Sequence, residues 1–550
     1  MLDPAGEGAE HDANNAQSVS SSSCFPFIAV RSGAFERIVA AWSFAEYPIL
    51  LLDLSQRTTS ESTMTGFSRR GFLQGSGATL IALSCSTPLA LAKRRGPNDE
   101  VRVACVGIRS RGTSHINGLH SLDGVRVVAL VDVDQDVLAR EKKKFTDRGE
   151  KVDTYTDLRH ALDREDIDAI SVASPNHWHA LQAIWACQAG KDVYLEKPVS
   201  HNIWEGAQIV KAARKYKRIV QTGTQSRSSH GIAQGIDWLQ AGNLGKIHLA
   251  RGLCYKPRKS IGKVAKPQEV GKHIDYNLWT GPAPMKPLMR KSLHYDWHWV
   301  FDTGCGDVGN QGIHQMDIAR WALGEKKLPS RTLSIGGRVG YDDDGDTPNT
   351  QMVYHEFESA PLIFEVRGLP RDKQAQSEDW GGRMDNYMGA RIGVIIHCEN
   401  GFLRIPDYNR AIALDLEGKE IQRFEGSSNH YANFIEAVRS RDVSTLKADI
   451  QEGHISSAMC HMGNISHHLG SGRKAREIAE SVASNKAAAE TYERLGAHLA
   501  ANQVDVESSG LRLGPWIEMD PETETFIGND AANRLATREY REGFVVPNKV

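Results

Sequence analysis

Between residues 101 and 223 the chain alternates short apolar runs with longer segments of helical character, and this pattern constrains the fold more than any other feature. The apolar runs cover residues 101–107, 125–132, 167–173, 191–195 and 219–223. Strands that alternate with helices form parallel βαβ units, because a crossover helix must return the chain to the start of the next strand. We therefore predict a doubly wound parallel α/β domain whose ligands bind beyond the carboxyl ends of its strands.

The first apolar run ends in a glycine turn, Gly107-Ile-Arg-Ser-Arg-Gly112. Its spacing is that of the dinucleotide fingerprint Gly-x-Gly-x-x-Gly, with Arg109 in place of the middle glycine. The second run ends at Asp132, about 20 residues beyond the turn, where a carboxylate can bind the ribose. The pattern predicts a Rossmann-type NAD site. Asp132 disfavours a 2′-phosphate, whereas Arg109 and Arg111 would attract one, so NADP stays an alternative.

A lysine follows another of these strands. The run 191–195 leads into Glu196-Lys197-Pro198, and a proline cannot continue a central strand because it has no N–H to donate. Glu196 and Lys197 therefore fall at a carboxyl end of the sheet. We predict that Lys197 is catalytic; the alternative is a solvated Glu–Lys pair.

The segment Ser174-Pro-Asn-His-Trp-His179 follows the run 167–173 and falls at the same edge. His177 and His179 could be read as a metal pair, but no third ligand or carboxylate lies near them in the sequence. We therefore predict no metal site and expect this segment to contact the cofactor.

After Gln225 the alternation ends and a second domain begins. The ranges 247–255, 332–340, 350–357, 362–367 and 391–397 have strand character. They predict a large open, mainly antiparallel sheet with helices on one face, in an α+β domain. Helices are expected at residues 429–439, 450–469 and 488–501. Trp297, in an aromatic-rich stretch, would either stack on a sugar or belong to the core.

Within this domain, glycines lead into a helix that carries His314 and Asp317 three residues apart, hence on one face. His314 is a second candidate catalytic residue, and the alternative is a capping or core histidine.

The glycine turn, Asp132, Pro175-Asn-His-Trp-His179 and Glu196-Lys-Pro198 together resemble the glucose–fructose oxidoreductase / inositol dehydrogenase / MocA family. The resemblance extends from about Val101 to the end of the second domain, which in this family forms one wall of the active-site cleft and often the oligomer interface. It implies a homo-oligomer, a sugar, cyclitol or sugar-derivative substrate, and a nicotinamide cofactor. The implied cofactor-binding residues are Gly107, Ile108, Arg109, Gly112, Asp132, Ser174, Pro175, Asn176, His179, Glu196, Lys197 and Gln225. The implied substrate contacts are Lys197, Trp297, Asn310 and His314.

The chain departs from the family at one catalytic position. The family pattern is Asp-x-Gly-x-His, and this chain reads Asn310-Gln-Gly-Ile-His314. An amide can position a hydroxyl but cannot accept its proton, which moves the role of general base to His314 or Lys197.

The N-terminal residues do not read as a domain. We expect residues 1–63 to be a non-native extension and translation to start at Met64. Residues 64–92 resemble a twin-arginine signal, with Ser68-Arg-Arg-Gly-Phe-Leu73 followed by a weakly apolar stretch. The resemblance implies export of the folded protein to a bacterial periplasm. The remaining chain divides into a dinucleotide-binding domain at 97–227, a substrate and oligomerisation domain at 228–470, and a C-terminal helix and tail at 471–550.

Composition excludes two classes of partner. Lys and Arg number 66 and Asp and Glu 68, which gives a net charge of -2 and no basic stripe for nucleic acid. No apolar run is long enough to span a bilayer.

Three functions fit these features. The first is hydride transfer between a secondary alcohol of a sugar and a tightly bound nicotinamide cofactor. The second is NAD-dependent glycoside cleavage by transient oxidation and elimination. The third, motivated by Arg109 and Asn310, is a non-catalytic dinucleotide- or sugar-binding protein.

Overall fold

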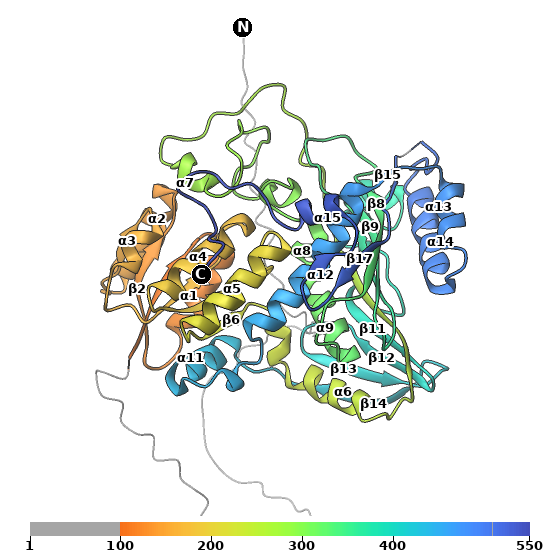
Figure 1. The fold of residues 1–550 in the computed structure, drawn as a ribbon, viewed down its shortest axis with the longest axis horizontal. Coiled ribbons are helices and arrows are strands. Elements are labelled where there is room, and N and C mark those ends of the chain that lie inside the picture. The colour runs from red at the N-terminus through yellow and green to blue at the C-terminus, as the bar shows by residue number, and fades with distance from the viewer. Residues whose placement is uncertain (1–99, 509) are drawn as a thin grey trace, which may run out of the picture. The chain divides into compact units, whose positions relative to one another are not determined.

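The computed structural model describes residues 100–508 and 510–550. The predicted N-terminal extension and twin-arginine signal lie outside these residues. Two sheets organise the described chain, one of six strands and one of twelve (Figure 1).

The six strands of the first sheet are all parallel and have the order β3-β2-β1-β4-β5-β6. They are β1 (Val101–Val106), β2 (Val125–Val131), β3 (Asp153–Tyr155), β4 (Ala169–Val172), β5 (Asp192–Leu195) and β6 (Val220–Thr222). The order reverses between β1 and β4, where doubly wound sheets bind their ligands. The predicted Rossmann-type sheet is confirmed. The sequence analysis missed only β3, a half-buried strand of three residues.

Helices cover both faces of this sheet, which explains why its strands are apolar throughout. One face packs against α1 (Arg111–His120), α2 (Gln135–Asp147) and α11 (His430–Ser440). The other packs against α3 (Leu158–Leu162), α4 (Asn176–Gln188) and α5 (Ile203–Lys215). Because α11 follows the second sheet in sequence, the chain crosses back to the first domain after residue 227.

The second sheet is mixed and mostly antiparallel, as predicted. Its path runs β14-β13-β12-β11-β7-β10-β9-β8-β16-β15, in which β7 and β10 are parallel neighbours. The central strands are β7 (Ile247–Tyr255), β8 (Arg331–Gly337), β9 (Thr350–Glu356), β10 (Leu362–Arg367) and β11 (Ile392–Cys398). An edge that the sequence analysis did not identify adds β12 (Gly401–Ile405), β13 (Arg410–Leu414) and β14 (Glu420–Glu425).

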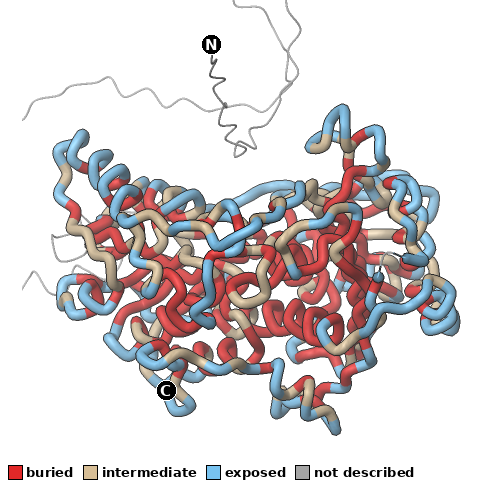
Figure 2. Tube along the Cα trace, turned by 90° about the horizontal axis from the view of Figure 1, so that it is seen from above, coloured by how far each residue is buried: buried red, intermediate tan, exposed pale blue. Residues whose placement is uncertain are grey.

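Helices flank this sheet on two sides, which corrects the expectation of one. α6 (His230–Gln240), α9 (Gly312–Leu323) and α12 (Ile450–Leu469) pack on one face. α13 (Ala475–Val482) and α14 (Lys486–Ala501) pack on the other face, over β8, β9 and β10 (Figure 1). Figure 2 shows the buried segments inside this arrangement and the exposed loops around it.

The C-terminal segment is more structured than a helix and a tail. It adds β15 (Ser471–Gly472), β16 (Arg512–Leu513), β17 (Ile517–Asp520), β18 (Thr525–Phe526) and α15 (Asp530–Leu535). Both β16 and β17 pair with β8. Beyond α15 the chain returns to the first domain, where Tyr540 packs on Trp204 of α5 and Phe544 on Trp178 of α4.

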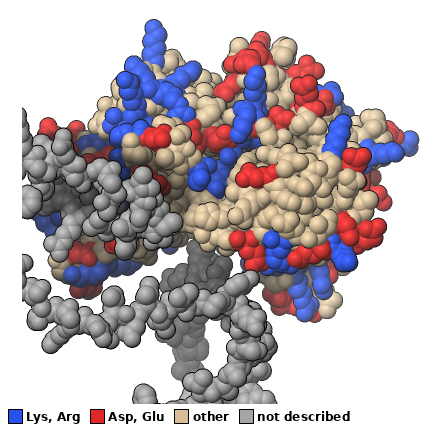
Figure 3. All heavy atoms as spheres, turned by 90° about the horizontal axis from the view of Figure 1, so that it is seen from below, with Lys and Arg blue, Asp and Glu red and all other residues tan. Residues whose placement is uncertain are grey.

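Positive and negative side chains are interspersed over the face shown in Figure 3. None of the helices in the described ranges combines the length and apolar character that crossing a bilayer requires.

Candidate active site

The turn after β1 is packed tightly against the turn after β4. Gly107 has a φ of +70°, and a Cβ atom there would lie 2.5 Å from the main-chain nitrogen of Ser174. A Cβ atom on Gly112 would lie 1.9 Å from the carbonyl oxygen of Gly107. The first glycine is therefore needed for the turn and the last for the approach of α1 to β1.

The N-terminus of α1 is suited to an anion. Ser110, which precedes the helix, has a φ of 50°, and its side chain makes no capping hydrogen bond. The first turn of α1 contains no acidic residue. Main-chain N–H groups that no side chain caps can bind a phosphate. The turn thus keeps a cradle that fits a pyrophosphate, with the exposed side chain of Arg109 where the middle glycine was expected.

Asp132 lies beside this turn, where the sequence predicted it. Its Oδ2 accepts a hydrogen bond from the main-chain nitrogen of Ile108 at 2.9 Å, and its Oδ1 accepts one from that of Asp134 at 3.1 Å. Burial raises the pKa of Asp132 to about 6, against the effect of these two hydrogen bonds. In this position a carboxylate can bind ribose hydroxyls and repels a 2′-phosphate.

Glu196 forms an ion pair that sequence reasoning missed. Arg111 Nε lies 2.6 Å from Glu196 Oε1, and His115 Nε2 lies 3.1 Å from the same oxygen. Burial opposes the charge of Glu196, but Arg111, His115 and Lys197 together hold its pKa well below the usual range. Glu196 is therefore ionised, and Arg111 and His115 already bind its carboxylate at the end of β5.

Lys197 reaches from the first domain to the second. Its Nζ donates a hydrogen bond to the main-chain carbonyl of Asn310, at the end of α8 (Gly306–Asn310), at 2.7 Å. Burial lowers the pKa of Lys197, Glu196 raises it, and the positive charges of Arg111 and Lys256 lower it further. The Lys197–Pro198 peptide bond is cis.

His314 lies in the first turn of α9 and is buried. Its Nδ1 has no hydrogen-bond partner among residues 100–508 and 510–550. Burial holds the pKa of His314 well below its usual value, and the positive charge of Lys197 adds to this effect. At neutral pH the imidazole is therefore uncharged and able to accept a proton. Its ring meets that of Tyr408 edge to face at 5.4 Å.

Gln311, between Asn310 and His314, joins two further groups to the site. Lys256, at the end of β7, donates from Nζ to Gln311 Oε1 at 2.7 Å. Gln311 Nε2 donates to the Tyr408 hydroxyl at 2.5 Å. Neither Lys256 nor Tyr408 was predicted. Lys256 directly follows the predicted strand 247–255, but no signal in the sequence shows that the end of this strand meets that of β5.

The predicted Ser174–His179 segment forms the start of α4 and connects strand ends. His179 contacts the carbonyl oxygens of Ser174 at 2.7 Å and Pro198 at 2.6 Å. His177 contacts those of Trp279 at 3.0 Å and Thr303 at 3.2 Å. Both ring nitrogens of each histidine thus contact main-chain carbonyl oxygens.

The other residues of this segment also contact the protein. Ser174 Oγ donates to Gln182 Oε1 at 2.6 Å, and Asn176 Oδ1 accepts from Cys305 Sγ at 3.5 Å. Pro175 precedes the first residue of α4.

Trp297 is placed in a buried cluster with Trp279, Leu288 and Leu293. Its indole N–H donates to the carbonyl oxygen of His294 at 3.1 Å, and the His298 ring stacks on it at 3.6 Å. This placement corresponds to the core alternative of the sequence analysis.

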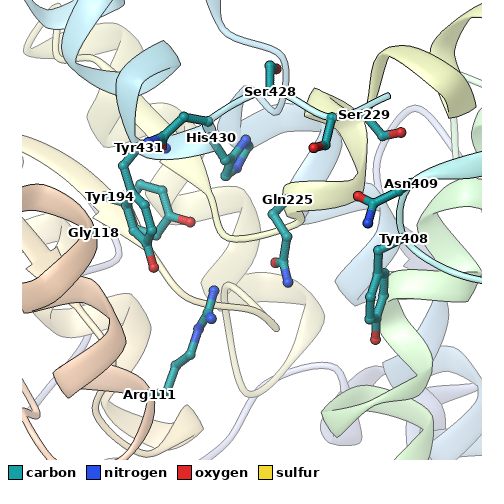
Figure 4. A pocket seen from close by; sticks show the side chains of 12 residues that line it. Arg111, Gly118, Tyr194, Gln225, Ser229, Tyr408, Asn409, Ser428, His430 and Tyr431 are labelled. Carbon is teal, nitrogen blue, oxygen red and sulfur yellow. The ribbon is translucent and has the colours of Figure 1, made fainter. Parts of the chain in front are cut away.

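A cavity of about 340 Å³ opens beside Arg111, between the two domains. Figure 4 shows Arg111 and Gln225 pointing toward each other, with Tyr194 and Tyr431 on one side and Tyr408 on the other. The Oε1 atom of Gln225 is buried and has no partner within the described ranges. An orphaned polar atom here fits the predicted contact of Gln225 with a cofactor.

The loop between β7 and α8 packs over the β2 end of the sheet. The main-chain nitrogen of Gln135 donates to the carbonyl oxygen of His273 at 2.9 Å, and that of Asp275 donates to Val133 at 3.0 Å. His294 Nε2 lies 2.8 Å from Asp134 Oδ2. The loop therefore borders the site from Lys256 to the neighbourhood of Asp132.

Two family models match this architecture. Residues 101–224 match the oxidoreductase family model with the NAD-binding Rossmann fold, and residues 245–356 match the model of its C-terminal alpha/beta domain. Both models are those of the Gfo/Idh/MocA oxidoreductase family. The predicted resemblance and the predicted NAD-binding domain are thereby confirmed.

Individual relatives differ in what their names describe. A glycosyl hydrolase family 109 protein of Shewanella sp. (strain ANA-3) is 32% identical over 176 residues, which are 28% of this chain and 39% of that protein. A 4-carboxy-2-hydroxymuconate-6-semialdehyde dehydrogenase of Sphingobium sp. is 27% identical over 179 residues, 32% of this chain and 55% of that one. A putative NADPH-dependent oxidoreductase from Desulfitobacterium hafniense has a related fold, with a TM-score of 0.50, 13% identity and coverage of 67% of this chain and 96% of that one.

Proposed function

We propose that this protein is an NAD(P)-dependent oxidoreductase that acts on a secondary alcohol of a sugar, cyclitol or sugar derivative. The observation that carries the proposal is the meeting of Lys197 and His314 at the edge of a dinucleotide-binding sheet. One is a partly buried amine that donates to the carbonyl oxygen of Asn310, and the other is a buried imidazole whose Nδ1 has no partner within the described ranges. Together they offer a proton acceptor and a cationic donor to a substrate hydroxyl.

The cofactor and three side chains have distinct roles in the proposed reaction. NAD, when bound, supplies an acceptor for the carbinol hydrogen as hydride. His314 takes the hydroxyl proton at Nδ1, since its imidazole is neutral. Lys197 donates a hydrogen bond to the same oxygen and stabilises its developing negative charge. The side-chain amide of Asn310 can orient the hydroxyl but cannot deprotonate it.

The cofactor would be held by the glycine turn and the uncapped end of α1 at its pyrophosphate, and by Asp132 at a ribose. The carboxylate of Asp132 favours NAD over NADP. Gln225, with its buried unpartnered oxygen, is a further contact.

A second candidate function rests on the glycosyl hydrolase relatives. In it, transient oxidation at one sugar carbon acidifies the neighbouring C–H bond and permits elimination of the glycosidic group, after which the cofactor is restored. The same proton acceptor and lysine would serve this cycle.

The test is to incubate the purified protein with a panel of free sugars, cyclitols and p-nitrophenyl glycosides. The oxidoreductase proposal predicts that a free sugar reduces bound NAD, seen as NADH absorbance, without release of nitrophenol. Catalytic release of nitrophenol with no net NADH favours the glycosidase. If neither signal appears and no dinucleotide binds, the non-catalytic alternative is favoured.

We also propose export by the twin-arginine route. The support is Arg69-Arg70 within Ser68–Leu73. A twin-arginine route exports folded proteins, which would let a bound cofactor travel with the protein. The Arg69→Lys/Arg70→Lys double variant should stay in the cytoplasm when cells are fractionated; a periplasmic variant would contradict the proposal.

Self-association through the second sheet is likewise a proposal. Because α13 and α14 cover β8, β9 and β10, the partner would use the part of the sheet formed by β12, β13 and β14. Light scattering on the purified protein checks it, and a monomer at all concentrations would contradict it.

A further inference from the structure

Two lysines from different domains converge on consecutive residues of one turn. Lys197, after β5, bonds to the carbonyl oxygen of Asn310, and Lys256, after β7, bonds to the side-chain oxygen of Gln311. The charge of Lys256 acts on both Lys197 and His314, so the three side chains lie near one another.

Both of these hydrogen-bond partners are neutral. In the described part of the chain, neither Nζ atom has a carboxylate within the 4.0 Å of an ion pair. Three buried arginines elsewhere in the chain have carboxylate partners, since Arg227 pairs with Asp317, Arg251 with Glu365, and Arg320 with Glu452. A buried charge without a counter-charge is costly unless a ligand supplies one.

The carboxylates that interact with these two lysines, Glu196 and Asp307, are already bound by other basic side chains. Glu196 is bound by Arg111 and His115. Asp307 receives two hydrogen bonds of 2.7 Å from Arg258, which lies two residues after Lys256. The site therefore holds four basic side chains (Arg111, Lys197, Lys256 and Arg258) and two carboxylates (Glu196 and Asp307). A bound oxidised nicotinamide would add another positive charge.

We propose that the substrate carries an anionic group, a carboxylate, sulfate or phosphate on the sugar, and that Lys256 binds it. This inference rests on the proposed function and adds the substrate class to it. In the proposed reaction Lys197 donates a hydrogen bond to the reacting oxygen. Lys256 is therefore the ammonium group that can bind the anion. The cofactor's pyrophosphate has its own cradle at the N-terminus of α1, the helix that begins at Arg111.

The test measures binding, so it does not depend on turnover. Calorimetry on the NAD-loaded protein compares methyl glucuronide, glucose 6-sulfate and glucose 6-phosphate with neutral methyl glucoside. We expect at least one anionic probe to bind at least about tenfold more tightly than the neutral one. Lys256→Met should weaken that probe about 100-fold and methyl glucoside less than about threefold, whereas Lys256→Arg keeps a preference. Lys259→Met, which removes an exposed lysine of the same loop, should change neither.

Several outcomes would overturn the inference. They are equal binding of neutral and anionic probes, binding of no anionic probe, and an equal loss for both kinds of probe in Lys256→Met. A loss of NAD in that variant would show that the anion is the cofactor's own phosphate. If the variant does not fold, the wild-type protein still decides, because only the affinity for an anionic probe should fall as salt rises. Failure of the proposed redox chemistry would show separately, as bound probe with no NADH.

Discussion

At the scale of residues, the proposed chemistry depends on two side chains, Lys197 and His314, with opposite tasks. Burial lowers the pKa of Lys197 and the neighbouring Glu196 opposes this effect, while burial and the charge of Lys197 hold the pKa of His314 well below its usual value. Lys197 can stabilise negative charge on the substrate oxygen, and His314 can take the proton of that hydroxyl.

Removing the amine should stop chemistry but not cofactor binding. Lys197→Met should lower kcat about 10²- to 10⁴-fold, the usual contribution of a positioned acid or base, because the alkoxide loses its cationic donor. Steady-state kinetics with bound NAD counted by mass spectrometry checks this. Lys259→Met is the control. If the Lys197→Met variant keeps the wild-type kcat, Lys197 has a structural role and no catalytic one.

The pH profile tests His314. Burial depresses its pKa in the folded protein, so the imidazole stays unprotonated at pH values where an exposed histidine, of pKa about 6.5, would already be half charged. The acid limb of kcat/KM should therefore lie below about pH 6.5. His314→Gln should remove that limb together with most of the activity. An acid limb above about pH 6.5 in the wild-type protein would contradict this assignment.

The sequence could identify these two residues but not their surroundings. Glu196-Lys197-Pro198 and His314 are recognisable because each belongs to a short local motif. Arg111, Lys256 and Tyr408 reach the site from other segments, and their roles depend on how two domains pack. Trp297 was an ambiguous candidate because an aromatic residue has the same sequence signature in a core and in a sugar site.

At the scale of elements, α9 places His314, and a buried ion-pair network holds α9. Arg227 contacts Asp317 of α9 with distances of 2.7 and 2.9 Å, and Arg320 of α9 contacts Glu452 of α12 at 2.6 Å. All of these groups except Glu452 are almost completely buried. The network ties the turn after β6 to the two helices below the second sheet.

Breaking this network should lower both stability and activity. Arg227→Met removes two hydrogen bonds from the buried carboxylate of Asp317, which keeps only Ser456 and, at 3.6 Å, Arg320. The free energy of unfolding should therefore fall by about 3 kcal/mol, the lower end of the cost of breaking a buried pair. Since Asp317 lies one helical turn beyond His314, kcat should fall as well. Chemical denaturation and kinetics measure the two effects. Lys143→Ala, which removes an exposed pair with Asp147, is the matched control and should change neither.

Elements were predictable from sequence where their pattern was local. The strands of the first sheet and the helices α5, α12 and α14 have clear periodicity or terminal signals. β3 and the strands from 401 to 425 were missed, because short strands that are partly exposed carry little apolar pattern. The second helical layer over β8, β9 and β10 is a tertiary feature that periodicity does not report.

At the scale of the whole molecule, neutral histidines with lowered pKa values should make the free energy of unfolding depend on pH in the acid range. Burial lowers the pKa of His177, His298, His355 and His467 to about 3, and of His397, His430 and His461 to about 4. In the unfolded chain these groups titrate near pH 6.5. Between about pH 6.5 and 4 the unfolded chain therefore binds more protons, so stability is present above this window and is lost as the pH falls through it.

The free energy of unfolding should thus decrease steeply from about pH 6.5 to pH 4, with uptake of several protons on unfolding. Denaturant titrations at a series of pH values measure the slope, and they must be made on protein with a constant cofactor load. An unfolding free energy that is flat over this window would contradict the burial of these histidines.

The central claim is that the first domain holds a dinucleotide next to Lys197. The most direct measurement is to denature protein expressed from Met64 and identify the released small molecules by mass spectrometry. We predict stoichiometric release of a nicotinamide dinucleotide, with NAD rather than NADP because of Asp132. If nothing is released and added NAD does not bind, hydride transfer is excluded, and Lys197 is an ordinary charge at the end of a strand.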